Sequence, residues 1–152
     1  MSMRVRLPRW ALLVAALCML SPAMAGQKIY TGWLSDVAIK GYDPVAYFTR
    51  GEATKGTDAH SLSWEGATWH FASAEHRALF KASPERYAPQ YGGHCAFAVA
   101  KGDLVKIDPE AWSIVNDKLY LNYSASIQRK WEAQQEQFIQ QAEARWPEIG
   151  QD

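Results

Sequence analysis

The sequence predicts a small α+β domain of antiparallel β-hairpins, covered by short helices and by a longer amphipathic C-terminal helix. One stretch alternates apolar and polar residues on either side of a turn pair, which is the pattern of half-buried strands in a hairpin, and a second turn pair lies between two short runs at residues 113–115 and 119–121. A third stretch, near the C-terminus, carries apolar residues three and four apart, which indicates a helix. The chain has 152 residues, 48% of them hydrophobic, enough for one compact core.

The first 25 residues have the layout of a secretory signal peptide. Three arginines precede an apolar run from Trp10 to Leu20 that is too short to span a bilayer, and residues 23–25 read Ala-Met-Ala, a small-x-small cleavage site. We therefore expect export to the periplasm or secretion. Residues 26–152 are then expected to form a single domain with no membrane span.

The charge of the exported chain argues against nucleic-acid binding. Cleavage removes three of the 16 basic residues and none of the 16 acidic ones, so 13 basic side chains face 16 acidic ones. Such a chain lacks the excess of basic charge that binding to phosphates requires. We expect no nucleic-acid partner.

Residues 61–71 predict a tight hairpin with Glu65-Gly66 as its turn, because glycine supplies the positive φ that a two-residue turn needs. The register that follows pairs Trp64 with Ala67, Leu62 with Trp69, and Ser61 with His70. One face of this hairpin is apolar. Each of its large side chains is worth about 1.5–3 kcal/mol when buried, so this face must be covered.

A helix beginning after Ser73 is predicted to supply that cover. The Ser73 hydroxyl suits an N-cap, and Glu75 in the first turn favours the helix dipole. The helix is expected to end near Ala82 or Ser83, since a residue that precedes proline resists helical angles.

A second group of elements is predicted after Tyr87. The apolar residues that follow Cys95 indicate a short helix that ends at Gly102. We then expect a strand at residues 104–107, a turn at residues 108–110, and a second hairpin with Asn116-Asp117 as its turn.

The last predicted element is an amphipathic helix over about residues 124–146, capped by Ser124 and ending before Pro147. It carries residues at helical spacing that would face the rest of the domain: Ile127, Trp131, Gln134, Phe138 and Ala142. Because no heptad pattern persists, packing on its own domain is favoured over a coiled coil. We recognise no internal repeat and no second domain.

Several spaced motifs resemble the YHS domain family. Trp69-His70-Phe71-Ala72-Ser73 is similar to the aromatic-His-Phe-x-Ser core of that family, and Asp43-Pro44-Val45 is similar to its opening motif. Three further matches lie at Trp64-Glu65-Gly66, at Phe80, and at Pro84 with Tyr87. The resemblance covers about residues 43–87, and the rest of the chain resembles the small secreted members of the family.

The resemblance implies a binding role with a transition metal, copper first. YHS domains occur in copper-transporting ATPases and in some monooxygenases, and their metal is thought to be held by cysteines. The corresponding three positions in this chain are Ala46, Ala72 and His76. Two of them therefore lack a ligand, and one offers imidazole in place of sulfur.

The candidate metal ligands of this chain are Cys95, His76, His70 and His94, because thiolate and imidazole suit copper and zinc. Cys95 is the only cysteine that remains after signal cleavage, so no internal disulfide is expected. It follows two glycines at the start of a helix, a place that favours thiolate. The other interpretations are a buried small hydrophobic residue for Cys95, and solvated or core-edge positions for the histidines.

We therefore expect an exported, non-enzymatic binding module, with a metal ion or a protein as its partner and copper as its first candidate cofactor. Two alternatives stay open. One is a structural or protein-interaction module with no metal site. The other is a thiol-dependent enzyme or redox protein that pairs Cys95 with His70 or His76.

Overall fold

The fold is α+β, as the sequence predicts, with α-helices around two antiparallel two-stranded sheets. A computed structural model describes residues 27–151, and the predicted signal peptide lies outside the described residues. Among residues 27–151, no helix combines the length and the apolar character that crossing a membrane requires.

The first hairpin has the predicted register. Strand β1 (Thr57–Trp64) pairs with β2 (Ala67–Phe71), and the pairs Trp64–Ala67, Leu62–Trp69 and Ser61–His70 all form. Glu65 and Gly66 have φ values of 51° and 73°, so both turn residues are left-handed, as a type I′ turn requires. Strand β1 starts earlier than predicted, beyond a register shift between Thr57 and Ser61.

The predicted cover is also confirmed. Helix α2 (Ala74–Ala82) begins after Ser73, whose hydroxyl accepts a hydrogen bond from the His76 amide at 3.1 Å. Phe80 on α2 is fully buried and packs against Trp69 and Phe71, with ring centroids 5.2 Å apart in each pair. The short helices α1 (Ala46–Thr49) and α3 (Pro84–Tyr87) complete this half of the molecule.

The second half confirms the predicted helix and hairpin but not the segment between them. Helix α4 (Ala96–Lys101) follows Cys95 and ends at Gly102, and β3 (Asp108–Val115) pairs with β4 (Lys118–Asn122) around the predicted turn. The strand at residues 104–107 and the turn at 108–110 were wrong, since β3 already begins at Asp108. Pro109 fits inside β3 because it lies in a register shift, where no regular ladder bond needs its missing N–H.

The predicted C-terminal helix is two helices. Ser124 caps α5 (Ala125–Glu132) as expected, but the chain leaves helical geometry at Gln134, and α6 (Gln135–Ile149) runs past Pro147. The break lets α5 pack on the second hairpin while α6 packs along α4. Three predicted inward residues, Trp131, Phe138 and Ala142, are buried, whereas Gln134 is exposed at the break.

The elements form an internal structural repeat, which corrects the expectation that the chain has none. The second hairpin, its Ser N-cap and the helices after it each begin 51 residues after their counterparts. The matched starts are β1 at 57 and β3 at 108, β2 at 67 and β4 at 118, α2 at 74 and α5 at 125, and α3 at 84 and α6 at 135. Even the register shift recurs, between Thr57 and Ser61 in one hairpin and between Asp108 and Trp112 in the other.

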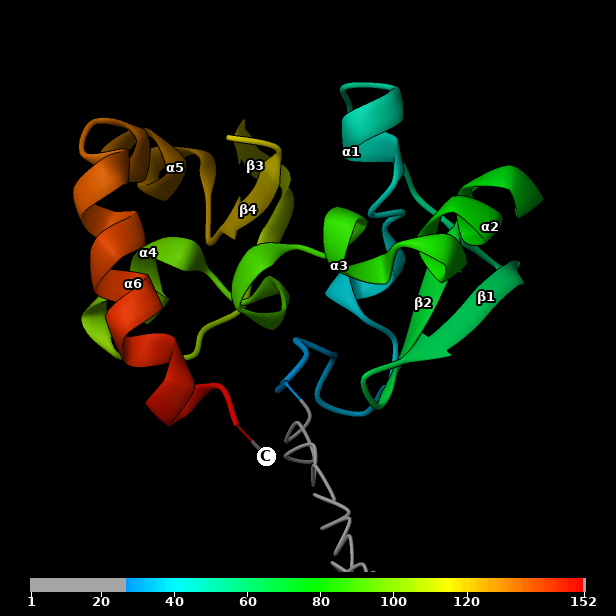
Figure 1. Ribbon diagram of the computed structural model, residues 1–152, viewed down its shortest axis with the longest axis horizontal. Coiled ribbons are helices and arrows are strands. Elements are labelled where there is room, and N and C mark those ends of the chain that lie inside the picture. Colours follow the sequence, from blue (N-terminus) through cyan, green and yellow to red (C-terminus); the bar gives the residue numbers. More distant parts are fainter. Residues whose placement is uncertain (1–26, 152) are drawn as a thin grey trace, which may run out of the picture.

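The segment before each hairpin repeats as well. Three consecutive left-handed residues precede α1 (Ile39, Lys40 and Gly41, φ 42°, 57° and 76°), and three precede α4 (Tyr91, Gly92 and Gly93, φ 57°, 60° and 82°). They belong to the short 3-10 helices η1 (Ile39–Gly41) and η2 (Gln90–Gly93). We call residues 39–87 the first repeat and residues 90–149 the second repeat. Figure 1 shows the first repeat on the right and the second on the left.

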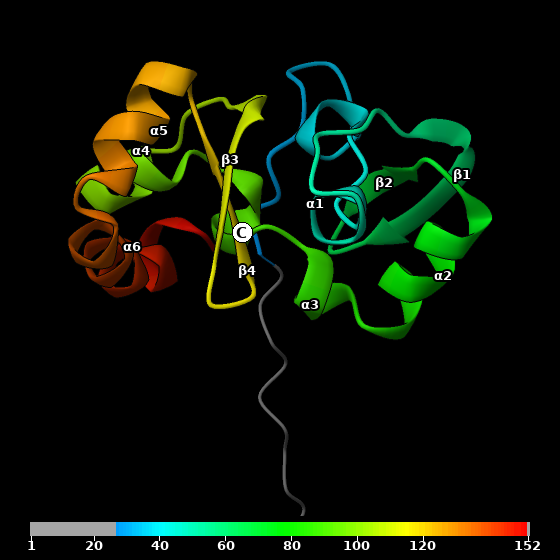
Figure 2. The same ribbon diagram turned by 90° about the horizontal axis from the view of Figure 1, so that it is seen from above.

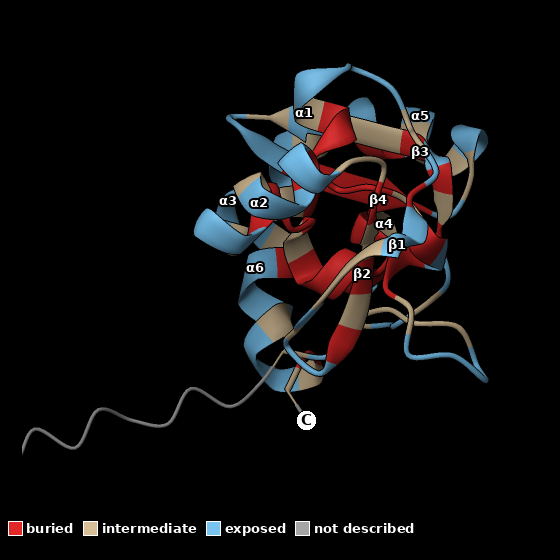
Figure 3. Cartoon of the chain, turned by 90° about the vertical axis from the view of Figure 1, so that its right-hand side faces the viewer, coloured by how far each residue is buried: buried red, intermediate tan, exposed pale blue. Residues whose placement is uncertain are grey.

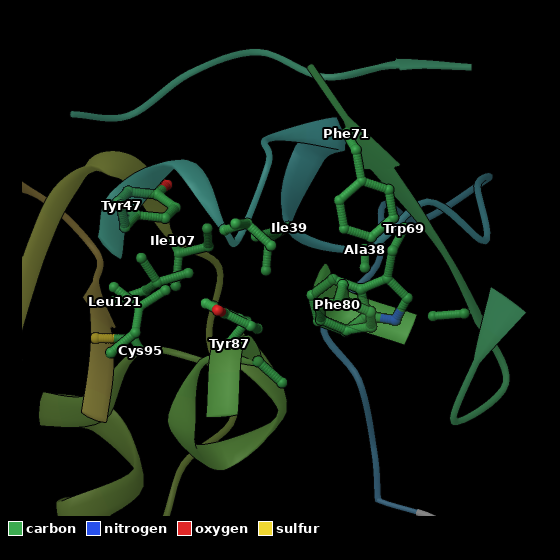
Figure 4. Packing of buried hydrophobic residues seen from close by; sticks show 14 of the residues in the cluster. Ala38, Ile39, Tyr47, Trp69, Phe71, Phe80, Tyr87, Cys95, Ile107 and Leu121 are labelled. Carbon is green, nitrogen blue, oxygen red and sulfur yellow. The ribbon is translucent and has the colours of Figure 1, made fainter. Parts of the chain in front are cut away.

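The two repeats share one continuous core. Ile39 lies between the aromatic group on β2 and α2 and the apolar group of Ile107, Leu121 and Cys95 in the second repeat (Figure 4). The Tyr47 hydroxyl on α1 donates to the Pro109 carbonyl oxygen at 2.9 Å, a hydrogen bond between the repeats. Burial is concentrated along β2, β4 and α4, whereas α2, α3 and α6 turn exposed faces outward (Figure 3).

The N-terminal segment (residues 27–38) runs between the repeats and ties them together (Figure 2). The Tyr30 amide donates to the Gly92 carbonyl, and the Lys28 amide donates to the Gly150 carbonyl, both at 2.8 Å. On the side of the first repeat, Val37 bridges to Thr68 on β2. The segment therefore lines the junction where the two repeats meet.

Candidate functional site

The carboxylate of Asp43 is the centre of a buried polar cluster in the first repeat. Asp43 is fully buried, and its Oδ1 accepts from the amides of Val45 and Ala46 at 2.9 and 3.3 Å. Its Oδ2 accepts from the Ala72 amide at 2.9 Å and lies 2.5 Å from His76 Nδ1. One side chain thus joins the start of α1, the end of β2 and the first turn of α2.

His76 connects this carboxylate to the surface. A carboxylate only accepts hydrogen bonds, so His76 Nδ1 donates to Asp43, and Nε2 faces the Thr49 hydroxyl at 3.2 Å. Thr49 is exposed at the end of α1 and also donates to the Val45 carbonyl. Asp43, His76 and Thr49 thus form a series of carboxylate, imidazole and hydroxyl. The Thr49 hydroxyl, however, already donates its hydrogen bond to the Val45 carbonyl.

Ala46, Ala72 and His76, which the sequence resemblance aligns with cysteines of the YHS family, all lie against this carboxylate. Ala46 and Ala72 donate their amides to Asp43, and His76 donates its ring N–H. Only His76 brings a metal-ligating side chain. The cluster therefore offers a carboxylate and an imidazole, which already bond to each other.

Cys95 is the counterpart in the second repeat of Asp43 in the first. In each repeat one residue separates this position from the left-handed turn, Tyr42 in the first and His94 in the second. The side chain of Cys95 is 1% exposed, and burial raises the pKa of the thiol, so the unreactive thiol form is favoured. Cys95 Sγ lies 3.7 Å from Oδ1 of the buried Asn122, which also accepts from the Phe97 amide. The thiol therefore lies beside the side-chain amide of Asn122, and its environment is typical of a small buried hydrophobic residue.

His94 lies in an aromatic setting apart from both clusters. Its ring packs edge-on against Tyr30, at 5.6 Å between centroids, and at a tilt against Trp146, at 6.1 Å. Neither ring nitrogen has a hydrogen-bond partner of good geometry among residues 27–151, although the Lys28 backbone lies nearby. Burial lowers the pKa of His94 to about 4, and the Lys28 backbone offsets only part of that effect.

The four predicted ligands are thus found in different settings. His70 lies on β2 opposite Ser61, near Gly41, while His76 pairs with Asp43, Cys95 with Asn122, and His94 with aromatic rings. Within residues 27–151, no group of three or more His, Cys, Asp or Glu side chains is arranged to hold a metal ion. Metal binding stays a prediction, because the described residues do not bring the predicted ligands together around one point.

A cavity of about 430 Å³ opens where the two repeats meet, and we call it the junction cavity. Its wall combines the N-terminal segment, the first repeat and the second repeat. The lining residues are Gln27, Ile29, Trp64, Glu85, Ala88, Pro89, Gln90, Tyr91, Lys118, Glu143, Trp146 and Pro147. Its size lies within the range of small-molecule sites, which commonly form at junctions between packed units.

Local packing holds the aromatic wall of the junction cavity in place. Tyr91 and Trp146 meet at 5.9 Å between ring centroids, and Trp64 packs on Trp69 and Phe80. Gly150 makes room for the indole of Trp146, because a Cβ at Gly150 would lie 2.4 Å from indole carbons. Tyr91 is 6% exposed, and its buried hydroxyl has no hydrogen-bond partner.

Sequence reasoning missed Asp43 as the centre of the polar cluster. It considered an aromatic-lined pocket for a small apolar ligand only as a secondary possibility and did not locate the junction cavity. For Asp43 a signal exists, because an Asp two or three residues before the amides of a helix start is a typical capping residue. The cavity has no local signal, since its walls come from residues 27 to 147.

No protein-family model matches the chain, and comparisons with curated proteins and with solved structures find no significant match. The resemblance to the YHS family therefore stays a prediction.

Proposed function

We propose that this protein is an exported binding module of the YHS type that catalyses no reaction, and that its ligand occupies the junction cavity. The observation that carries the proposal is the junction cavity itself, about 430 Å³ in volume, with Trp64, Tyr91 and Trp146 among its lining residues. Small-molecule sites are commonly cavities of this size that are lined by aromatic side chains and a few polar groups.

The environment of Cys95 argues against the alternative that the protein is a thiol-dependent enzyme or redox protein. A catalytic or redox thiol needs access to solvent and a group that favours thiolate. Cys95 is buried, its pKa is raised, and its sulfur faces an amide oxygen. We therefore propose a structural role for this thiol.

The arrangement around Asp43 supports the family resemblance and leaves copper as the second candidate. The three family ligand positions lie around one carboxylate, as residues of one former or alternative metal site would. Titration of the purified protein with Cu(I) and Zn(II) tests this candidate. Affinity weaker than about micromolar, or affinity unchanged in a Cys95→Ala, His76→Ala double variant, would remove it.

The interaction-module alternative has one observation in its favour. Trp33 and Leu34 stand at the tip of a turn and are 96% and 87% exposed. Neither Trp33 nor Leu34 lines the junction cavity, so a partner bound at this tip would not occupy that cavity. Its position makes Trp33 a useful internal reference for ligand mapping.

The proposal is tested by NMR with a library of small fragments, using the tryptophan indole N–H signals of ¹⁵N-labelled protein. Trp→Phe variants assign the signals. We expect fragments that bind to shift the signals of Trp64 and Trp146 and to leave Trp33 unchanged. Fragments that shift neither cavity tryptophan, or that gather at Trp33, would contradict the proposal.

A further inference from the structure

The wall of the junction cavity brings three aromatic side chains together from three separate elements. Trp64 comes from β1, Tyr91 from η2 and Trp146 from α6. The faces of aromatic rings attract cations, and indole does so most strongly. Three rings around one cavity of this size give a wall that can surround a compact ligand group.

Two carboxylates join the aromatic wall, one from each repeat. Glu85 comes from α3 and Glu143 from α6, and among the described lining residues Lys118 is the single cationic one. Within residues 27–151 the only ion pair is the one between His76 and Asp43, so neither glutamate is neutralised by a basic partner. The described lining residues of the cavity therefore carry one net negative charge.

The Tyr91 side chain adds no charge to the cavity wall. Burial, together with the neighbouring Tyr120 and Glu143, raises the pKa of Tyr91, so this side chain stays a neutral phenol. The hydroxyl itself is buried, with no hydrogen-bond partner among residues 27–151.

From these features we infer that the junction cavity selects a small organic cation, with a substituted ammonium group held by the aromatic rings and by Glu85 and Glu143. This inference rests on the proposed function and names the chemical class of the ligand. An organic anion would meet two carboxylates and one lysine. A neutral apolar ligand would use the rings but gain nothing from the charges.

The experiment compares three probes of nearly equal shape that differ in charge. Choline is the cation, 3,3-dimethylbutan-1-ol replaces its nitrogen by carbon, and 3,3-dimethylbutanoate is an anion of similar bulk. Binding to the purified protein is measured by calorimetry and by tryptophan fluorescence. We expect choline to bind at least about tenfold more tightly than the alcohol, with an advantage that shrinks as salt is added.

Paired variants locate the binding. Glu143→Gln removes one charge from the cavity wall at an exposed position, so the fold should be preserved. It should weaken choline binding about fivefold and leave the alcohol unchanged. Glu148→Gln lies on the same helix outside the cavity and should have no effect. Trp146→Leu should weaken choline more than the alcohol, whereas Trp33→Leu should change neither.

The outcomes separate this inference from the proposed function. If the alcohol binds as tightly as choline and shifts Trp64 and Trp146, the cavity binds ligands but the preference for cations is wrong. If the anion binds most tightly, the charge of Lys118 outweighs the two glutamates in ligand selection, and the inference is likewise overturned. If no probe binds and no fragment reaches the cavity, both fail. If Glu148→Gln weakens choline as much as Glu143→Gln, the binding lies elsewhere and the inference falls.

Discussion

The two repeats have the same order of elements but differ in the side chain that follows the left-handed turn. In the first repeat, Asp43 binds three amides and the ring of His76. In the second, Cys95 stands at the equivalent place, and Ile127 stands where the first repeat has His76. The same backbone arrangement therefore holds a buried carboxylate network around Asp43 in the first repeat. In the second repeat it holds the Cys95 thiol beside the amide of Asn122.

The hairpins differ in the same direction. Strand β2 alternates between buried and half-buried residues, whereas the last four residues of β4 are all buried. Leu119 and Leu121 face the core shared with the first repeat, and Tyr120 faces the core formed with α4, α5 and α6. The second hairpin is thus the middle layer of the molecule, and the first is an outer layer. Within that outer layer, Asp43 and His76 join the start of α1, the end of β2 and the first turn of α2.

The largest expected difference between the repeats is the cost of removing the side chain after the turn. Asp43→Ala leaves three amides and an imidazole N–H without a partner in the interior, at a cost of about 4 kcal/mol. Cys95→Ala removes one buried sulfur and should cost about 1–2 kcal/mol. Denaturant unfolding measures both.

Asp43→Asn serves as a second variant, since it keeps an oxygen for Val45 and Ala46 and should lose about half as much. Equal losses for Asp43→Ala and Cys95→Ala would mean that the two positions are held by similar forces, against the comparison drawn here.

The left-handed turns should differ nearly as much. Lys40 and Gly92 have φ values of 57° and 60°, but a Cβ on Gly92 would lie 2.0 Å from the Lys28 carbonyl oxygen. Gly92→Ala should therefore displace the N-terminal segment and cost about 3 kcal/mol. Lys40→Ala keeps a Cβ at an exposed position and should stay within about 0.5 kcal/mol. If Gly92→Ala leaves the free energy of unfolding unchanged, the N-terminal segment does not pack as closely against this turn as described.

His94 gives a smaller effect that depends on pH. Its pKa is lowered to about 4 in the folded protein, from 6.5, so the unfolded chain binds the proton more readily. Stability from His94 is complete above about pH 6.5 and is lost as the pH falls toward 4. Between pH 7 and pH 5, the protein should lose about 2 kcal/mol more than a His94→Phe variant, which keeps a ring against Tyr30 and Trp146. Parallel pH dependence of unfolding in the two proteins would contradict the buried neutral imidazole.

The smallest prediction concerns a feature that the repeats share. Ser73 and Ser124 each accept an amide hydrogen bond at the start of a helix, at 3.1 and 3.3 Å. Ser73→Ala and Ser124→Ala should each cost about 1 kcal/mol, measured by thermal or denaturant unfolding. Costs that differ by more than about 1 kcal/mol would mean that the two caps are not equivalent.

Local chemistry made much of the fold predictable. Two turn pairs set both hairpin registers, and two serines marked the helix starts, because turns and caps depend on adjacent residues. The helix break was not predictable in this way, since Gln134 is an ordinary helix residue and the break follows from packing of α6 on α4.

The repeat and the junction cavity escaped prediction for related reasons. Equivalent positions carry different chemistry, such as Phe71 and Asn122, or Phe80 and Trp131, so the likeness lies in spacing and backbone angles. The cavity depends on how α6 and the N-terminal segment meet the first repeat, which no stretch of sequence encodes alone. Among the predicted ligands, His76 bonds to Asp43, a contact between residues 33 apart that no local pattern indicated, and metal binding stays a prediction.

A crystal structure of the protein with choline bound tests the central claim most directly. We predict ordered density for the ammonium group among Trp64, Tyr91 and Trp146, with Glu85 or Glu143 alongside. Choline ordered beside Asp43 and His76, or an empty junction cavity at a concentration that saturates binding in solution, would contradict the assignment of this cavity as the ligand site.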